Sequence, residues 1–230
     1  MSFLRKKGTQ LFLCILLVHL ASIWIEWEQV RFVSKLLLVP FLIFWLLSHI
    51  KPPKQLKTVF FPILGLLGAF AGDYLLSLSG ETYFLIGMLG FMTTHICNSI
   101  YFLRLQPLKI KNNQPLLIVG LLLIFICLVV IVPIKDQLGD FLLPIFCYMI
   151  LISVMTLFAT NLYQSAHKHN ALYYFIPGAL FFVLSDCILA INKFQLHQSI
   201  FHIPIMFTYG MAILLLTTGF VKSEISPQLL

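Results

Sequence analysis

Charged residues are scarce in this chain of 230 residues. Asp, Glu, Lys and Arg together make up 10% of it, whereas about 25% is usual for a soluble globular protein. Hydrophobic residues make up 60%, and the mean hydropathy is +0.98. This composition excludes a water-soluble domain, and it equally excludes a disordered, collagen-like or disulfide-stapled chain. We therefore expect an integral membrane protein.

Several familiar motifs are also missing. The five cysteines are scattered through apolar runs and form no CxxC pair, so we expect small apolar side chains rather than disulfides or zinc ligands. There is no Gly-rich phosphate loop, no Gly-x-Ser-x-Gly and no His-Glu-x-x-His. The chain also lacks the arginine ladder of a voltage sensor and a filter-like sequence. Function must therefore be sought in isolated polar residues.

Long apolar runs dominate the sequence. A helix needs about 20 apolar residues to cross the hydrocarbon core of a bilayer. The first run follows a basic patch, as in a signal peptide, but no small-residue cleavage site comes after it, so we expect an uncleaved helix. We predict an all-α integral membrane protein with a single transmembrane domain, residues 1–230. Its eight transmembrane helices are predicted at 9–25, 33–50, 57–78, 82–104, 114–133, 140–163, 171–191 and 199–221.

Lysine and arginine alternate between the two sides of these eight helices. Three of them, Arg31, Lys135 and Lys193, fall on one side, and eleven fall on the side of the N-terminus. The eleven are Arg5, Lys6, Lys7, Lys51, Lys54, Lys57, Arg104, Lys109, Lys111, Lys168 and Lys222. Because Lys and Arg accumulate on the cytoplasmic side of membrane proteins, both termini are predicted to be cytoplasmic. The net charge of +7 then reflects topology, and we expect no nucleic acid partner.

Two of the eight acidic residues, Asp73 and Asp186, fall deep inside predicted helices. Each lies roughly fifteen residues into its helix, about 22 Å along the axis. A carboxylate near the middle of the bilayer costs ~2.5–3.5 kcal/mol on insertion scales, and such residues usually mark a functional site. The alternative is that each aspartate only ties helices together through a polar partner.

The two aspartates also belong to a weak internal repeat. Residues 65–76 resemble residues 178–189, because in each segment a glycine precedes the aspartate by eight residues and a hydrophobic pair follows it. The two copies lie on the third and seventh predicted helices. A parallel four-plus-four duplication would produce this similarity, and chance resemblance between two apolar helices is the alternative.

Further polar residues interrupt the apolar helices. Lys35 is the only cation inside a predicted helix, and it can snorkel, reach the aspartates or bind an anionic ligand group. Thr94, His95, Asn98 and Tyr101 share one stripe of a helix, which indicates an internal cavity, although a lone histidine is more often structural.

Two other spacings point to shared helix faces. His202 and Tyr209 are seven residues apart and so lie on one face. Gly65, Gly68 and Gly72 lie on one side of their helix, a pattern that lets helices approach closely.

The segments around the aspartates resemble the YhhN-type lysoplasmalogenase family of eight-helix membrane proteins. The first family signature is matched by Gly72-Asp73-Tyr-Leu-Leu, Phe84-Leu-Ile-Gly87 and His95. The second, Gly-Ala-Leu-Phe-x-x-Ser-Asp-x-x-Leu-Ala-x-Asn-Arg/Lys-Phe, is matched by residues 178–194 with one extra apolar residue. Residues 35–40 and the pair Thr208-Tyr209 are also similar to family segments. The family often has Tyr where this chain has Asn98, and Gln where it has Ile213.

The resemblance implies hydrolysis of the vinyl ether bond of a lysoplasmalogen to a fatty aldehyde and glycerophosphocholine or glycerophosphoethanolamine. Protonation of an alkenyl carbon followed by water capture suits two carboxyl groups in different environments. We expect Asp73 and Asp186 to be this catalytic pair, with no metal or cofactor. The residues expected to bind substrate or support the pair are Lys35, His95, Asn98, Ser185, Asn192 and Tyr209.

The expected partners are therefore a lysophospholipid and the lipid bilayer. The resemblance implies the inner membrane if the protein is bacterial and the endoplasmic reticulum membrane if it is eukaryotic. The sequence does not fix the oligomeric state or the head group.

Two other functions remain open from the residues. One is a zinc-dependent membrane lipid hydrolase, which would need about three histidines converging with an aspartate; His95 and His202 would contribute. The other is a proton-coupled transporter that uses Asp73 and Asp186 as a relay.

Overall fold

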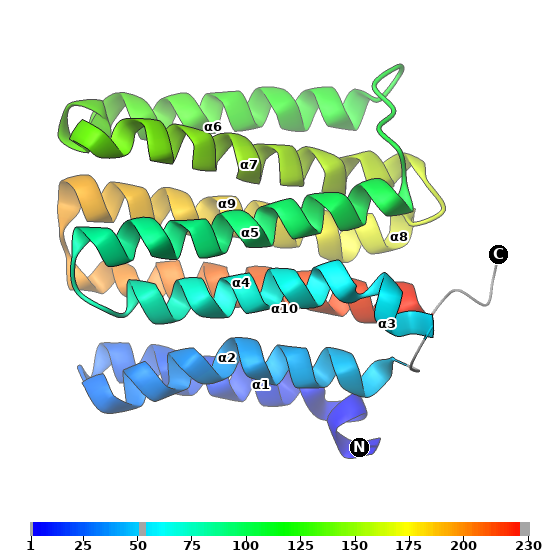
Figure 1. Ribbon diagram of the computed structural model, residues 1–230, viewed down its shortest axis with the longest axis horizontal. Coiled ribbons are helices and arrows are strands. Elements are labelled where there is room, and N and C mark those ends of the chain that lie inside the picture. The colour runs from blue at the N-terminus through cyan, green and yellow to red at the C-terminus, as the bar shows by residue number, and fades with distance from the viewer. Residues whose placement is uncertain (1, 51–53, 226–230) are drawn as a thin grey trace.

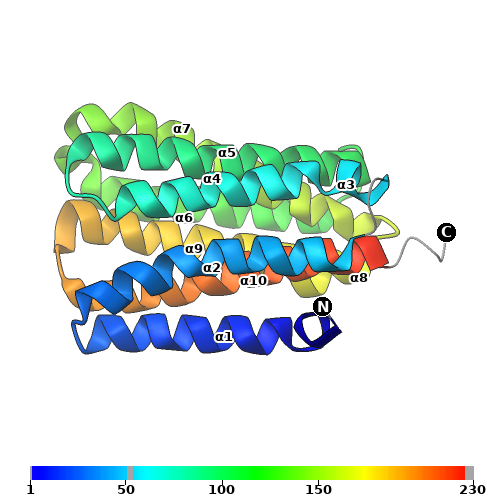
Figure 2. The same ribbon diagram turned by 60° about the horizontal axis from the view of Figure 1, so that its bottom comes forward.

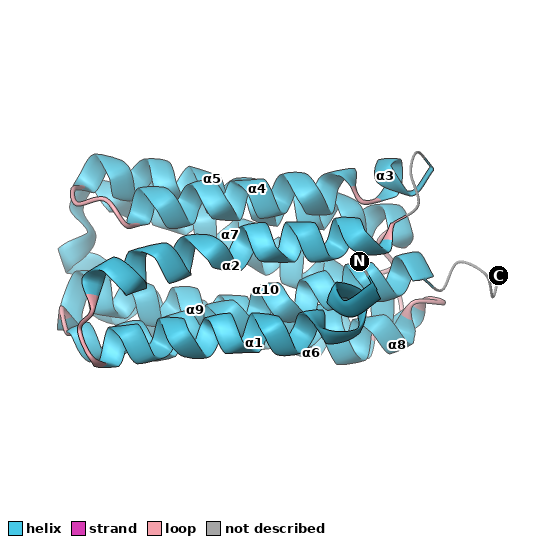
Figure 3. Ribbon diagram, turned by 90° about the horizontal axis from the view of Figure 1, so that it is seen from below, coloured by secondary structure: helices cyan, strands magenta, loops and turns pink. Residues whose placement is uncertain are grey.

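The computed structural model describes residues 2–50 and 54–225, and within these residues it is a bundle of helices without strands (Figures 1 and 3). The long helices are α1 (Ser2–Trp24), α2 (Glu28–His49), α4 (Phe60–Leu76), α5 (Glu81–Leu105), α6 (Gln114–Leu138), α7 (Leu142–Asn161), α9 (Ile176–Ile191) and α10 (His202–Ile225). Shorter helical segments are α3 (Lys54–Thr58), α8 (Lys168–Asn170), 3-10 turns at Gly139–Phe141, Leu162–Gln164 and Ser199–Phe201, and π-helical turns at Ala171–Phe175 and Asn192–Leu196.

The described helices have the length and composition of membrane spans. Six helical segments are long and apolar enough to cross a membrane. One of them, Gln114–Gln164, contains both α6 and α7, which lie side by side and run in opposite directions (Figure 1). Helix α4 is apolar but has 17 residues. The chain is therefore a multi-pass membrane protein, and eight crossings stay a prediction.

Helices α1 and α10 place the two ends of the described chain together. Helix α1 begins and α10 ends at the same end of the bundle, as an even number of crossings requires (Figure 1). The other segments of the predicted basic side, namely α3, the α5–α6 connection and α8, lie at that end too. Lys51, which belongs to the basic set, lies outside the described residues.

Most helix boundaries agree with the predicted ones within a few residues, and proline explains one clear difference. The span predicted at 57–78 is divided into α3 and α4 at Val59. Pro62 has no N–H to donate to the carbonyl of Thr58, and its ring crowds that carbonyl, so the helix breaks there. Pro133 does not end α6, which continues to Leu138, since proline is tolerated inside membrane helices.

The remaining differences lie at helix ends. Helices α1 and α2 begin earlier than predicted, at Ser2 and Glu28 rather than at residues 9 and 33. Helix α10 continues to Ile225 rather than ending at residue 221. These extensions are polar and basic, so a search for apolar runs omits them although the helical hydrogen bonds continue.

The centre of the bundle is formed by four helices, α4, α5, α9 and α10. Helices α1 and α2 pack on one side of them, and α6 and α7 on the other (Figures 1 and 2). Helix α2 contacts α4 and α10, while α7 contacts α5 and α9. Polar residues from α2, α4, α5, α7, α9 and α10 can therefore meet inside the bundle.

Helices α4 and α5 approach each other through glycine, as the spacing predicted. A Cβ atom added at Gly68 would lie 2.7 Å from the carbonyl oxygen of Gly90, and one added at Gly90 would lie 2.7 Å from that of Gly68. Gly72 faces the ring of Phe91 in the same seam. This close packing fixes α4, and with it Asp73, relative to α5.

The first prediction concerns this seam. Gly68→Ala places a methyl group against backbone that cannot move aside, so we expect it to destabilise the protein by about 1–3 kcal/mol, as overpacking does. Gly120→Ala on α6 is the matched control, because its Cβ would meet only Leu157, at 3.7 Å. It should be neutral, or stabilising by up to about 1 kcal/mol from helix propensity. Thermal unfolding in detergent tests this, and equal melting temperatures for the two variants would contradict it.

The second prediction concerns orientation. In a cysteine-free variant, Asp136→Cys should react with a membrane-impermeant thiol reagent added to intact cells, because α6 ends on the side poor in Lys and Arg. Asn112→Cys, at the other end of α6, should react only after permeabilisation. The opposite pattern would invert the proposed orientation, and labelling of both from outside would show that α6 does not cross the membrane.

Candidate active site

Asp73 lies near the end of α4, three residues before its last residue, Leu76. Its side chain is buried, and its Oδ2 atom accepts a hydrogen bond of 2.6 Å from the Tyr209 hydroxyl of α10. The Lys35 Nζ atom of α2 lies 3.7 Å from the other carboxylate oxygen, Oδ1. Three helices therefore meet at this carboxyl group.

Lys35 is held in place by more than the ion pair. Its Nζ atom donates to the Ser77 hydroxyl at 3.3 Å, and that hydroxyl donates to the backbone oxygen of Asp73 at 2.7 Å. Of the roles open to Lys35 from sequence, contact with an aspartate is the one seen here. The lysine is still partly exposed, which leaves its ammonium group accessible from the cavity described below.

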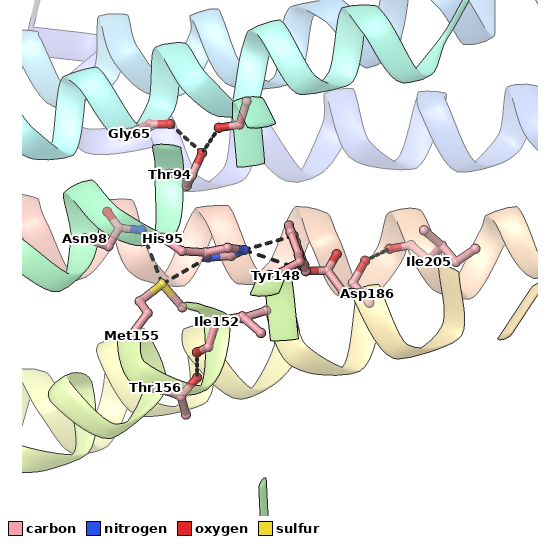
Figure 4. A network of polar contacts seen from close by, with 12 residues as sticks. Gly65, Thr94, His95, Asn98, Tyr148, Ile152, Met155, Thr156, Asp186 and Ile205 are labelled. Atoms are coloured by element: carbon pink, nitrogen blue, oxygen red, sulfur yellow. Dashed lines mark hydrogen bonds and ion pairs between the residues drawn. The ribbon is translucent and has the colours of Figure 1, made fainter. Parts of the chain in front are cut away.

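Asp186 on α9 has a different set of partners. Its Oδ2 atom accepts a hydrogen bond of 2.6 Å from the Tyr148 hydroxyl of α7. The His95 Nε2 atom of α5 lies 2.9 Å from the same hydroxyl and 3.9 Å from Asp186 Oδ2 (Figure 4). Whether His95 donates to or accepts from the tyrosine depends on its tautomer. These three side chains form a continuous polar chain with no lysine or arginine in it.

The far side of His95 is closed by weak polar contacts. The Sδ atom of Met155 lies 3.4 Å from His95 Nδ1, and it accepts a contact of 3.7 Å from Asn98 Nδ2 (Figure 4). Thr94 donates to the Gly65 carbonyl of α4 at 2.8 Å. This stripe of α5 packs against α4 and α7 and lines neither cavity described below. Thr94, His95 and Asn98 make polar contacts with α4 and α7 in place of the predicted cavity, while Tyr101 packs against the rings of Phe175 and Phe220.

Aromatic rings separate the two carboxyl clusters. Phe182 packs edge-on against His95, with ring centroids 4.8 Å apart, and against Tyr209, at 5.6 Å. Phe91 contacts both Phe182 and Tyr209. The rings fix the orientation of His95 and Tyr209 and keep this part of the bundle apolar.

Both aspartates line one cavity of about 730 Å³. It lies at the end of the bundle where α2 and α10 begin and α4 ends, and its lining is rich in polar groups. Besides the two aspartates, the polar side chains are His19, Glu28, Gln29, Arg31, Lys35, Ser77, Ser79, Ser185, His202 and Tyr209. His202 and Tyr209 face the same cavity, as their spacing predicted.

A second, narrow cavity of about 60 Å³ lies on the other side of Asp186, between α5, α6, α7 and α9. It is lined mainly by apolar side chains, with Tyr148 and Asp186 at its polar end. Asp186 lines both cavities, and so do Leu76, Phe91 and Leu189. The carboxyl group therefore stands at the junction of a polar space and an apolar one.

The partners of the two aspartates follow one pattern. The eight long helices form two sets of four in chain order, α1, α2, α4, α5 and α6, α7, α9, α10. Asp73 lies on the third helix of its set, and its partners come from the second helix of that set and the fourth of the other. Asp186 lies on the third helix of its set, with partners from the corresponding helices. This is the arrangement expected from a parallel four-plus-four duplication.

Some residues expected to support the site lie elsewhere. Asn192 closes the turn after α9, where its Oδ1 atom accepts from the backbone N–H of Gln198 at 2.9 Å. Ser185 lines the polar cavity but donates to the backbone oxygen of Ile205 at 3.0 Å, which ties α9 to α10. His95 is buried and reaches Asp186 chiefly through Tyr148, with its Nε2 atom 3.9 Å from the carboxylate. Asn98 is buried behind it and contacts Met155 instead.

Sequence reasoning missed Tyr148, which donates to Asp186. The internal repeat contained a signal for it, because Lys35 on the second predicted helix corresponds to a residue of the sixth, where Tyr148 lies. It also gave Arg31 only a topological role, although this side chain lines the polar cavity.

The zinc-hydrolase alternative requires a cluster of metal ligands. Among the residues that the structure describes, no three His, Cys, Asp or Glu side chains lie close enough to hold a metal ion. His202 lines the polar cavity, whereas His95 lies behind Tyr148. The histidines that this alternative would bring together are therefore used at different places.

Comparison with known proteins gives one match. A family model described as the YhhN family matches residues 30–220. No curated protein and no solved structure gives a significant match. The matched range includes both aspartates and all of the side chains that contact them. The chain belongs to the YhhN family.

Proposed function

We propose that the protein is a lysoplasmalogenase, which hydrolyses the vinyl ether bond of a lysophospholipid to a fatty aldehyde and a glycerophospho-base. The observation that carries the proposal is the position of the two aspartates. Both face the polar cavity, and Asp186 also faces the narrow apolar cavity. A lysoplasmalogen has a polar head group, then the vinyl ether bond, then an apolar chain. The polar cavity, the two aspartates and the narrow apolar cavity follow one another in the same order. Membership of the YhhN family supports the same activity.

The surroundings of the two carboxyl groups favour different roles. Lys35 lies beside Asp73, and a neighbouring cation stabilises an ionised carboxylate. Asp186 has a tyrosine and a histidine as partners, so nothing compensates a negative charge there to the same degree. We therefore assign Asp186 as the general acid and Asp73 as the carboxylate that stabilises positive charge and activates water.

The chain from Asp186 to His95 suits a group that gains and loses a proton. When Asp186 is ionised, Tyr148 donates to it. When Asp186 is protonated, the carboxyl group can donate to the Tyr148 oxygen while the hydroxyl donates to His95 Nε2, which lies 2.9 Å away. Both protonation states are therefore satisfied by reversing the same hydrogen bonds, with His95 Nε2 donating to Tyr148 in the first state and, after a change of tautomer, accepting from it in the second.

The reaction begins when Asp186 gives its proton to the alkenyl carbon that is not bonded to oxygen. Positive charge develops on the other alkenyl carbon and its oxygen, and the Asp73 carboxylate stabilises it. A water molecule from the polar cavity adds to that carbon as it gives a proton to Asp73. Asp186 then takes the hydroxyl proton of the resulting hemiacetal while Asp73 gives its proton to the leaving glycerol oxygen, and the carbon–oxygen bond breaks. Both aspartates end as they began.

The alkenyl chain is assigned to the narrow apolar cavity beyond Asp186. At about 60 Å³ this cavity is too small for a long chain unless the side chains that line it move. Met88 and Met149 line it, and their unbranched side chains change shape more easily than branched ones. Substrate binding therefore involves rearrangement of side chains between α5, α6, α7 and α9.

The third prediction tests the catalytic pair. Asp186→Asn removes the acid, and we expect aldehyde release from lysoplasmenyl-ethanolamine to fall at least about 100-fold, since general acid catalysis contributes roughly 10²–10⁴-fold. Asp73→Asn should also lower the rate strongly. Asp140→Asn is the matched control, because Asp140 is exposed and lies outside both cavities. Full aldehyde release by both pair variants would exclude this mechanism, and no release by the purified wild-type protein would favour the transporter alternative.

The fourth prediction tests the positioning role of Tyr148. Tyr148→Phe leaves Asp186 and His95 without their shared partner, so we expect kcat to fall about tenfold with KM nearly unchanged and the pH–rate profile to move. Tyr173→Phe, an exposed tyrosine, is the control and should keep the wild-type profile. A variant that loses thermal stability but keeps the wild-type kcat and pH profile would show that Tyr148 is only structural.

A further inference from the structure

Three charged residues follow one face of α2 from the mouth of the polar cavity inward. Glu28, Arg31 and Lys35 are spaced three and four residues apart, and all three line the cavity. The seven residue-to-residue steps from Glu28 to Lys35 cover about 10 Å along the helix. The order of charge is therefore negative at the mouth, then positive, then positive beside Asp73.

The two outer charges have no ionic partner within the described chain. Lys35 is paired with Asp73, but no ion pair within residues 2–50 and 54–225 includes Glu28 or Arg31. Glu28 is exposed and Arg31 is partly exposed. An anion and a cation are thus available at the entrance, one helical turn apart.

A neighbouring hollow of about 420 Å³ shares Glu28 and Arg31 with the cavity. It adds a second carboxylate, Glu26, and the Ser199 hydroxyl. Among the described residues that line this hollow, Trp24 is the one aromatic side chain. This hollow is thus rich in hydrogen-bond acceptors and poor in aromatic rings.

We propose that Glu28 and Arg31 form a head-group subsite for a lysophospholipid whose phosphate carries a primary ammonium group, as in ethanolamine. The proposal rests on the proposed function, because it places the vinyl ether at the aspartates. Arg31 binds the phosphate, for which the guanidinium group is well suited. Glu28, supported by Glu26, accepts hydrogen bonds from the ammonium group. The charges of the lipid then follow the charges of α2 in order.

The same contacts discriminate between amines. A primary ammonium group has three N–H donors, and hydrogen bonds to a carboxylate from such a donor are strong. A trimethylammonium group has no N–H and is usually recognised by several aromatic rings around it. Because Trp24 stands alone in the hollow, the subsite favours ethanolamine over choline.

The test uses lipids that carry an ester in place of the vinyl ether, so that binding is measured without hydrolysis of that bond. The probes are lysophosphatidylethanolamine, lysophosphatidylcholine and lysophosphatidic acid with the same saturated chain, titrated against the purified full-length protein in detergent. We expect the wild-type protein to bind the ethanolamine lipid about tenfold more tightly than the choline lipid, a difference typical of one charged hydrogen bond.

Substitutions at the entrance should separate the two contacts. Glu28→Gln should remove the preference for ethanolamine and leave binding of lysophosphatidic acid equal or stronger. Arg31→Gln should weaken all three lipids about tenfold, because the phosphate is common to them. Glu81→Gln and Lys135→Gln are matched controls, since both side chains are exposed and line neither hollow. Glu81 begins α5 and Lys135 lies in the last turn of α6, and these helix ends lie at the same end of the bundle as the start of α2 (Figure 1).

Equal binding of the ethanolamine and choline lipids by the wild-type protein would overturn the proposal. It would also be overturned if Glu28→Gln kept the preference, if Arg31→Gln bound all three lipids as well as the wild type, or if none of the lipids bound. The proposed function is tested separately. Aldehyde release without head-group preference would leave the hydrolase and exclude the subsite, whereas preference without aldehyde release would leave the subsite and exclude the hydrolase.

Discussion

Two carboxyl groups set between apolar helices, Asp73 buried and Asp186 partly buried, are the constraint on which the rest of the arrangement depends. A buried carboxyl group without partners is costly, so each aspartate must receive hydrogen bonds or an ion pair from another helix. Asp73 obtains them from α2 and α10, and Asp186 from α7 and, through Tyr148, from α5. The crossing of these helices is therefore tied to the chemistry of two side chains. Close glycine packing between α4 and α5 completes the frame.

The same constraint explains why the donors come from corresponding helices. In this bundle of two corresponding halves, the aspartate of each third helix is reached by a side chain from the second helix of its own half and by one from the fourth helix of the other. A carboxyl group on either third helix finds partners at those two places and, in this chain, does so in both halves. The weak resemblance between residues 65–76 and 178–189 then agrees with an arrangement in space that does not depend on it.

The apolar runs predicted the helices, and the scarcity of acids pointed to Asp73 and Asp186. Polar spacing singled out His95 and Tyr209, and the family resemblance assigned them to the site. Tyr148 was missed because the sequence of a membrane helix does not by itself reveal which face turns inward, and the repeat, which relates Lys35 to Tyr148, was recognised only around the two aspartates. For the same reason the stripe on α5 suggested a cavity where α4 and α7 pack. The break at Val59 was predictable from Pro62, whereas the role of Asn192 in the turn after α9 required the fold.

The two halves differ where the proposed chemistry needs them to differ. At corresponding positions, the second helix of one half supplies Lys35 and that of the other supplies Tyr148. A lysine favours a carboxylate that stays ionised, while a tyrosine hydroxyl can donate to a carboxylate or accept from a carboxylic acid. Acid–base catalysis requires one group of each kind. Duplication alone would give two equivalent aspartates, and the exchange of one partner is sufficient to make them different.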